Sequence, residues 1–202
     1  MARRGAYAKG LAKREEILDA ALRVVAEHGY RKASVREIAD AVELSPAGLL
    51  HYFGSKEELF VAILAARDAR DEDRVTSEDI VEGLLEIVGR NTAVPGLVQL
   101  YAQLAAEAAD PDHPARAFFA HRTARLEGYA IAELEAAQRA GRIRGDLDPA
   151  WIIRSVHALA DGLQTAWLID RDIDMAADLR RFIALLEPAP ASAQDPAPGD
   201  AT

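Results

Sequence analysis

Side chains that can contact phosphates or base edges cluster in one short stretch of the sequence. Ser45, His51 and Tyr52 carry groups that hydrogen-bond to nucleic acids, and Lys56 adds a positive charge. Ala47 lies among them, and a small residue lets the backbone approach the bases closely. Proteins position themselves on duplex DNA through cationic and hydrogen-bonding contacts of this kind. The stretch therefore has the chemistry of a DNA-contacting surface.

The spacing of capping residues predicts the elements that position these groups. Residues 34–53 have the pattern of two short helices joined by a tight turn, and a third helix follows at once. Ser34 and Ser55 each precede a glutamate by three residues, which is the capping-box pattern. Ser45 is a further cap, and Pro46 sits at a first helical position, where its missing N–H costs nothing. Helices of about two turns each fit a helix-turn-helix.

Apolar residues fall where the buried faces of these helices require them. The first helix carries apolar residues at helical spacing, namely Val35, Ile38, Ala39 and Val42. Leu49 and Phe53, four residues apart, anchor the second helix, and Leu44 fills the angle between the two. The small and polar residues of the second helix are therefore expected to face outward.

On these motifs the sequence resembles the TetR-type (tetracycline-repressor-like) transcriptional regulators. The resemblance covers roughly the first quarter of the chain, through the segments that begin Lys13-Arg-Glu-Glu-Ile, Val35-Arg-Glu-Ile-Ala, Leu49-Leu-His-Tyr-Phe and Ser55-Lys-Glu-Glu-Leu. It implies an N-terminal three-helix DNA-binding domain and a C-terminal helical domain that binds a small molecule and dimerises. It also places operator contacts at Arg36, Ser45, Pro46, Ala47, Gly48, His51, Tyr52 and Lys56.

Two positions depart from the pattern of that family. Glu43 stands where the family has a turn glycine, so it must either adopt a left-handed conformation at some cost or shift the turn. Leu50 stands where an aromatic residue is common, which removes one contact to a phosphate or a thymine methyl. Both departures leave the operator sequence open.

The distribution of charge agrees with a DNA-binding N-terminal part. The net charge is −9, but the residues through Arg36 carry nine basic and four acidic side chains, a balance of +5 that leaves −14 on the rest. A basic head binds the phosphate backbone while an acidic body repels non-specific DNA. Residues 1–10 contain Arg3, Arg4 and Lys9. We interpret them as a basic flexible arm along a groove, with a plain disordered start as the alternative.

Helical periodicity continues through most of the chain, and no strand alternation is long enough to compete with it. The pattern predicts an all-α fold of about nine helices. Besides the helix-turn-helix, helices are expected over 11–27, 56–74, 80–90, 97–109, 115–140, 151–169 and 174–186. The domains are then 11–72 for DNA binding and 73–187 for effector binding and dimerisation, and the tail 188–202 is expected to be disordered. The charged residues 67–74 are expected to bridge solvent between the two domains.

Composition argues against several function classes. Cysteine is absent, which excludes disulfides, thiolate metal sites and cysteine nucleophiles. No apolar run approaches the ~20 residues that span a bilayer, and no signal peptide is recognisable, so a cytoplasmic protein without a membrane partner is expected. His113 and His121 have Pro114 between them, which is poor spacing for metal ligands. Without a phosphate-binding loop or a catalytic triad motif, we expect no enzyme, no metal and no cofactor.

The helix over 151–169 is apolar on more than one face, so it requires cover on both sides. One side can pack on its own domain and the other on a second subunit, with Gly162 permitting close approach. Together with the helix over 174–186, it would form a four-helix interface across a two-fold axis. The alternative is the central helix of a monomer. We expect a homodimer.

The resemblance implies a small-molecule effector, and eight residues of the C-terminal domain are candidates to bind it. They combine aromatic walls with polar groups: Tyr101, Phe118, Arg122, Arg125, Tyr129, His157, Gln164 and Trp167. Each has a plainer interpretation, because aromatic residues build cores and His157 can be an ordinary buried histidine. The two arginines can instead pair at the surface with Glu127 or Glu107. Nothing in the sequence identifies the effector.

The favoured hypothesis is a DNA-binding transcriptional regulator, a ligand-responsive repressor that binds a near-palindromic operator as a homodimer. Ligand in the C-terminal domain would change the separation of two recognition helices and so weaken binding to double-stranded DNA. The alternative hypothesis is a helical enzyme or ligand-binding protein whose N-terminal helices only pack the fold. The sequence leaves open the operator, the effector, the regulated genes and the choice between repression and activation.

Overall fold

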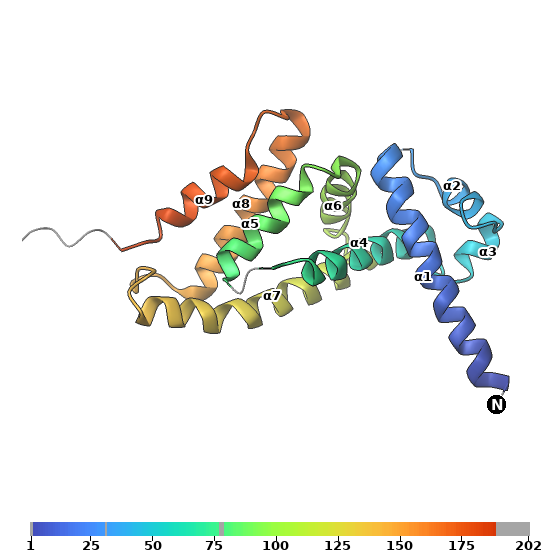
Figure 1. The fold of residues 1–202 in the computed structure, drawn as a ribbon, viewed down its shortest axis with the longest axis horizontal. Helices are drawn as coiled ribbons and strands as arrows, with labels where there is room; N and C mark the ends of the chain where they lie inside the picture. Colours follow the sequence, from blue (N-terminus) through green and yellow to red (C-terminus); the bar gives the residue numbers. More distant parts are fainter. Residues whose placement is uncertain (1, 31, 77–78, 189–202) are drawn as a thin grey trace, which may run out of the picture.

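A computed structural model describes residues 2–30, 32–76 and 79–188, the first six of them by their backbone alone. These residues form nine α-helices and no strand, so the predicted all-α fold is confirmed (Figure 1). The helices are α1 Ala2–His28, α2 Val35–Asp40, α3 Pro46–Leu50, α4 Lys56–Asp73, α5 Ile80–Asn91, α6 Pro95–Glu107, α7 Pro114–Arg139, α8 Pro149–Ile169 and α9 Met175–Ala184. In the described part of the chain, no helix is long and apolar enough to cross a membrane.

Two apolar cores hold the helices together. The first lies within the head, which we define as α1, α2, α3 and the first half of α4; its fully buried residues include Ile17, Val25, Ile38, Leu49, Leu59 and Ile63. Leu100 and Leu104 of α6 belong to the same core, so the head is packed directly on the body, α5 to α9. The second core lies inside the body and includes Leu85, Val98, Trp167, Met175 and Leu179.

α1 is longer than the sequence pattern predicts. Residues 2–10, expected as a flexible arm, continue the helix, and Figure 1 shows these first turns extending away from the rest of the molecule. Most of them are Ala, Arg or Lys, which lengthen an existing helix at little cost because nucleation has already taken place. The helix ends at His28 because Gly29 follows with a φ of 76°, a left-handed conformation that glycine adopts freely.

The second half of α4 does not bridge solvent, which corrects the expectation for residues 67–74. It lies alongside α7 and also contacts α6 (Figure 1). Arg67 is only 6% exposed there. Helical periodicity predicts the helix but not the elements that return to cover it. Arg67 and Asp68 find ionic partners there, while residues 72–74 at the end of the helix stay exposed. α4 is therefore held at both ends, in the head and in the body.

A close approach of two helices joins the head to the body. α6 begins at Pro95, slightly earlier than the predicted 97, because proline fits a first helical position. The next residue, Gly96, lies against α1: a Cβ placed on it would be 2.0 Å from the carbonyl oxygen of Val25. Since real Cβ atoms never approach so closely, α1 and α6 can meet in this way only because position 96 has no side chain.

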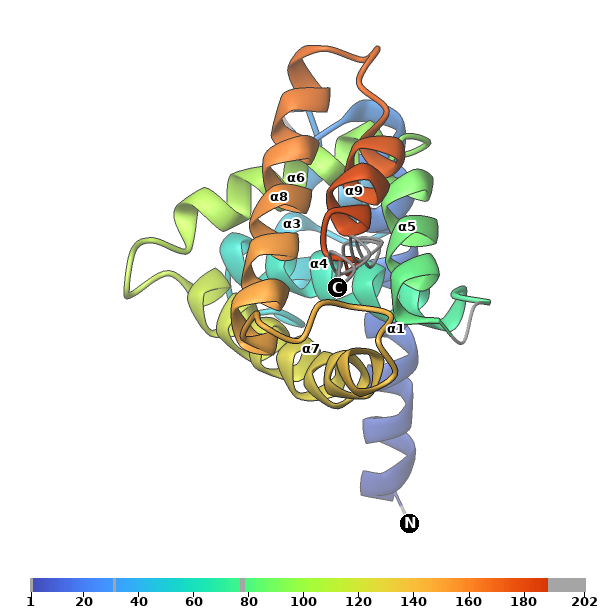
Figure 2. The same cartoon turned by 90° about the vertical axis from the view of Figure 1, so that its left-hand side faces the viewer.

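α8 runs through the body in contact with α6, α7 and α9, and α9 packs in turn on α5 (Figure 2). Asp148 and Asp174 cap α8 and α9 through carboxylate oxygens that accept backbone N–H bonds. Trp151 and Ile169 of α8 remain exposed, so the body does not cover all of the apolar surface of this helix. The tail expected to be disordered lies, from residue 189 on, outside the described residues.

Replacing Gly96 with alanine is expected to destabilise the protein by about 1–3 kcal/mol, because the added methyl overpacks the contact between α1 and α6. Urea unfolding followed by circular dichroism measures the change. Gly89→Ala in α5 is the matched control, since a Cβ there meets nothing within 4 Å. It is expected to stabilise the helix by roughly 0.5–1 kcal/mol. A Gly96→Ala protein as stable as wild type would contradict the close contact.

Candidate functional site

Three serine hydroxyls fix the starts of the helices that form the predicted helix-turn-helix and its continuation. The Oγ of Ser34 accepts from the backbone N–H of Glu37 at 3.1 Å, and the Oγ of Ser45 accepts from the N–H of Gly48 at 3.0 Å. Ser55 caps α4 in the same way at 3.0 Å. Each bond satisfies a donor that the helix itself leaves free. The caps therefore fix where α2, α3 and α4 begin.

The turn between α2 and α3 takes the left-handed alternative at Glu43, whose φ is 55°. For a residue other than glycine this conformation is strained. Leu44 follows half-buried against the core of the head, and its N–H donates to the carbonyl of Ala39 at 2.9 Å. Lys13 of α1 donates to the carbonyl of Val42 at 3.1 Å, which ties the turn to the first helix. The turn is thus held in place at a cost in backbone strain.

α3 is anchored from one side, as predicted. Leu49 is fully buried and Phe53, just after the helix, is nearly so. The guanidinium of Arg14 lies 4.8 Å from the centroid of the Phe53 ring and covers it from α1. A five-residue helix has little stability of its own, so these contacts and the Ser45 cap determine how it is oriented.

The other side of α3 faces outward at the end of the molecule farthest from α9 (Figure 1). The eight residues proposed to contact DNA lie on α2, at the cap before α3, on α3, in the turn after it and at the first position of α4. Six of them are exposed, and Gly48 and Tyr52 are half-buried; the exposed ones are Arg36, Ser45, Pro46, Ala47, His51 and Lys56. The rings of His51 and Tyr52 meet edge to face with centroids 6.2 Å apart. None of the eight is fully buried, although Tyr52 also packs against the core of the head.

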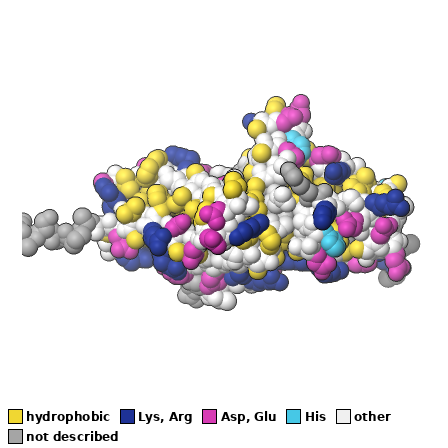
Figure 3. Space-filling view, turned by 90° about the horizontal axis from the view of Figure 1, so that it is seen from above, with side chains coloured by type: hydrophobic (Ala, Val, Ile, Leu, Met, Phe, Trp, Pro, Cys, Tyr) yellow, Lys and Arg dark blue, Asp and Glu magenta, His cyan; other side chains and the backbone are white. Residues whose placement is uncertain are grey.

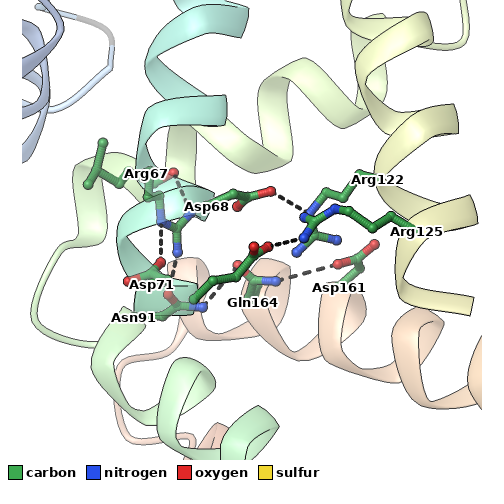
Figure 4. A network of polar contacts seen from close by, with 10 residues as sticks. Arg67, Asp68, Asp71, Asn91, Arg122, Arg125, Asp161 and Gln164 are labelled. Atoms are coloured by element: carbon green, nitrogen blue, oxygen red, sulfur yellow. Dashed lines mark hydrogen bonds and ion pairs between the residues drawn. The ribbon is translucent and has the colours of Figure 1, made fainter. Parts of the chain in front are cut away.

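The body contains a small cavity of about 70 Å³ between α4, α5, α6, α7 and α8. Its walls come from five helices. α4 and α7 contribute mainly charged residues, and α5, α6 and α8 contribute one residue each. The lining residues are Arg67, Asp68, Asp71 and Glu72 of α4, Ile87 of α5, Tyr101 of α6, Arg122, Arg125 and Leu126 of α7, and Gln164 of α8. Figure 4 shows the polar members reaching toward one another from these helices. The cavity is therefore lined by a network of ion pairs and amides.

One part of this network centres on the buried Arg67. Its guanidinium donates to the side-chain oxygen of Asn91 and to the carbonyl of Leu97, and its Nε lies 3.4 Å from a carboxylate oxygen of Asp71. Asn91 in turn donates to Gln164 at 3.5 Å. Burial lowers the pKa of Arg67, and the nearby Asp71 opposes that effect. Through these contacts α4 is joined to α5, α6 and α8.

The other part joins α4 to α7. The Nε of Arg122 donates to Asp68 at 2.7 Å, and its guanidinium lies 5.4 Å from the centroid of the Tyr101 ring. Arg125 pairs with Glu72 at 2.5 Å where the cavity meets solvent. Burial raises the pKa of the Tyr101 hydroxyl and that of Asp161 beside it. The arginines therefore pair across to α4, and not with Glu127 or Glu107 as the plainer interpretation supposed.

The structure brings together only part of the predicted effector set. Tyr101, Arg122, Arg125 and Gln164 line the cavity. The other four lie elsewhere: Phe118 meets Phe119 edge to face, Tyr129 is 62% exposed, Trp167 is buried in the second core, and His157 is half-buried outside the lining. Burial and then the charge of Arg122 lower the pKa of His157.

Sequence reasoning missed the α4 side of the cavity, which consists of Arg67, Asp68, Asp71 and Glu72. The available signal was the alternation of acidic and basic residues along that helix, which equally fits a solvated face. Among the described residues, no group of three or more His, Cys, Asp or Glu side chains is placed to hold a metal ion. His113 instead caps α7, its Nδ1 accepting from the N–H of Ala115 at 3.2 Å.

Comparison with known proteins agrees with the geometry of the head. Residues 17–63 match the family described as "Bacterial regulatory proteins, tetR family". The chain is 32% identical over 157 residues to the HTH-type transcriptional repressor Rv1474c of Mycobacterium tuberculosis, covering 75% of this chain and 80% of that protein. It is 27% identical over 182 residues to the HTH-type transcriptional repressor AcnR of Corynebacterium diphtheriae, with coverages of 90% and 93%.

The whole fold also has a counterpart among solved structures. A TetR transcription regulator from Haloarcula marismortui superposes on it with a TM-score of 0.71 at 22% identity, covering 87% of this chain and 96% of that one. The likeness extends over head and body, so the arrangement of the two parts is common to both proteins.

Relief of the strained turn gives a test of the α2–α3 geometry. Glu43→Gly is expected to stabilise the protein by about 0.5–1 kcal/mol, because glycine adopts a positive φ without the steric cost. Glu43→Ala is the control, since alanine keeps that cost while removing the same carboxylate. Thermal and urea unfolding distinguish the two. An equal gain in both variants would mean that charge, not backbone strain, limits stability at this position.

Proposed function

Since the chain belongs to the TetR family of bacterial regulatory proteins, we propose that it represses transcription by binding a near-palindromic operator as a homodimer, and that a small-molecule effector releases it. The observation that carries the proposal is the placement of α3. Leu49 and Phe53 hold this helix from inside, while Ala47 and His51 face solvent at the tip of the head. A recognition helix requires this division between a buried and an exposed side.

Each exposed group of the head then has a role in contacting duplex DNA. Ala47 and Gly48 let the start of α3 approach base edges, and His51 and Tyr52 hydrogen-bond to bases or phosphates. Ser45, Pro46 and Arg36 flank the helix on the sides where the DNA backbones pass. Lys56 neutralises a phosphate from the first turn of α4, and the positive balance of the N-terminal residues adds to the attraction.

The proposed homodimer forms through the helices predicted over 151–169 and 174–186, which correspond to α8 and α9. Three large apolar side chains on these helices face solvent in the single chain: Trp151 is 45% exposed, Ile169 85% and Leu185 72%. Figure 3 shows hydrophobic side chains between charged ones on the half of the molecule that carries α8 and α9. Pairing these faces across a two-fold axis would bury that surface and place two α3 helices roughly 34–36 Å apart, one turn of DNA.

The effector acts through α4 in this proposal. Its first half lies in the core of the head, and its second half lines the cavity of the body. A ligand that binds better when α4 is displaced favours the state in which the two α3 helices no longer match successive major grooves. Bound ligand lowers the affinity for DNA by the same factor by which bound DNA lowers the affinity for the ligand.

Lys56→Ala is expected to lower affinity for all DNA sequences and to reduce the slope of log K against log salt by about one, because one phosphate contact is lost. Fluorescence anisotropy with duplex DNA from the upstream region of the gene, over a range of salt concentrations, measures both quantities. Arg139→Ala removes an exposed positive charge from α7, far from the head, and is expected to leave the slope unchanged. An unchanged slope for Lys56→Ala would exclude its phosphate contact.

Ile169→Asp tests the dimer, because it places a charge within the proposed apolar contact, at the end of α8. Light scattering is expected to give twice the 21.9 kDa chain mass for the wild type and a value near the single chain for the variant. Leu11→Asp, at another exposed apolar side chain but on α1, is expected to remain dimeric. A monomeric wild type at micromolar concentration would contradict the homodimer.

A further inference from the structure

A shallow groove on α7 lies apart from the cavity described above and shares no residue with it. It has a volume of about 450 Å³ and lies beside the end of α6, where Figure 2 shows α6 and α7 meeting at the edge of the molecule. Six of its seven lining residues belong to α7, and the seventh, Ala108, directly follows α6. The groove is therefore essentially one face of a single helix.

The groove residues recur at helical spacing along α7. Four of them follow one another at intervals of four, three and four positions, namely Arg116, Ala120, Thr123 and Glu127. These intervals place them on one face of the helix. Between the two charged ends the face consists of small exposed side chains, those of Ala120, Thr123 and Ala124. Another helix can therefore lie along this face at an interaxial distance of about 8–10 Å.

One aromatic residue adds apolar surface to the groove. Phe119 is half-buried, and its ring meets those of Tyr101 and Phe118 edge to face, with centroid distances of 5.3 and 5.2 Å. These two contacts hold the ring in place, while the rest of its surface lines the groove. An apolar surface placed against it would remove that area from water, which is favourable.

The two ends of the groove carry opposite charges, and neither forms an ion pair within the described part of the chain. Arg116 is exposed, and its guanidinium donates only to the carbonyl of Ala109 at 3.4 Å. Glu127 is half-buried beside His157 of α8, on whose charge it acts. Both charges are therefore available to a partner that presents an acidic and a basic group at the same spacing.

The groove is complementary to a second copy of itself when the two α7 helices run antiparallel. A two-fold axis between His121 and Arg122 brings together positions that lie equally far on either side of it. The six groove residues of α7 then form three kinds of contact between the copies: Arg116 with Glu127, Phe119 with Ala124, and Ala120 with Thr123. Opposite charges meet at both ends, and the one large side chain meets a small one, as close packing requires.

We propose that this face of α7 is a second self-association surface, on which another copy of the chain docks its own α7 in the antiparallel arrangement. The contact goes beyond the proposed function, since it uses neither the α3 surface nor the faces of α8 and α9. Exposed ion pairs and one aromatic contact give only weak association, with a dissociation constant on the order of 0.1 mM. The α7 contact therefore adds to the homodimer and does not replace it.

Disulfide cross-linking of the full chain tests the arrangement directly, because the sequence contains no cysteine. Ala120→Cys and Thr123→Cys chains are mixed in equal amounts at about 0.1 mM and oxidised with glutathione disulfide. The pairing places these positions opposite each other, within the roughly 7 Å between Cα atoms that a disulfide spans, so a covalent dimer is expected on a non-reducing gel. Ala132→Cys, exposed on α7 but outside the groove, is the control and is expected to remain uncrosslinked. Absence of the dimer from the mixture, or equal cross-linking of the control, would overturn the pairing.

Charge reversal tests the two ends of the groove. Arg116→Glu or Glu127→Arg, introduced into both cysteine chains, places like charges opposite each other and is expected to slow cross-linking at least about tenfold. Mixing an Arg116→Glu chain with a Glu127→Arg chain restores opposite charges across the contact and is expected to restore the rate, which no change within one chain can do. Arg139→Glu, on the same helix but outside the groove, is expected to leave the rate unchanged. Circular dichroism checks folding, and failure of the mixture to recover would contradict the Arg116–Glu127 contact.

Ile169→Asp in both cysteine chains separates this contact from the proposed homodimer. Cross-linking through α7 is expected to persist when the contact of α8 and α9 is lost. Its disappearance would mean that the α7 face belongs to the same interface, and the second surface would be refuted. A wild type that is monomeric at micromolar concentration would contradict the homodimer, while cross-linking at the higher concentration still decides the α7 pairing.

Discussion

The structure depends on one helix being packed in two different environments. The first half of α4 contributes Leu59, Ile63 and Leu64 to the apolar core of the head, where burial in water is favourable and does not depend on ionic partners. The second half is joined to the body by the pair of Asp68 with Arg122 and by the bond from Arg67 to Asn91, while Arg70 pairs with Asp19 of α1. The first half of α4 is therefore part of the head, and its second half is part of the body. The helix itself links the two.

The ion pairs in the second half of α4 add little to the stability of the protein, but they fix the orientation of this helix on the body. Moving charges such as those of Arg67 and Asp68 out of water costs several kcal/mol each, and their attraction offsets that cost only when the geometry is good. The arrangement is therefore close to balanced, and small changes in its partners shift it. Gly96 supplies the complementary rigid contact, because the close approach of α1 and α6 leaves little freedom between head and body at that point.

Sequence reasoning predicted the features that depend on local chemistry. The serine caps at 34, 45 and 55, the anchors Leu49 and Phe53 and the all-α fold follow from spacing and capping rules that act within a few residues. It could not predict which distant elements meet. The burial of Arg67, the exposure of Tyr129 and the pairing of Arg122 with α4 all depend on how α7 crosses the molecule, and local periodicity does not contain that information. The helical start of α1 was missed because residues 2–10 carry no cap and no inward face.

Hydroxyl-radical footprinting on DNA upstream of the gene tests most directly whether α3 acts as a recognition helix in a two-fold assembly. The account predicts two protected segments centred about 10–10.5 base pairs apart on one face of the duplex, related by approximate two-fold symmetry. Protection of a single segment, or uniform protection without sequence preference, would contradict it.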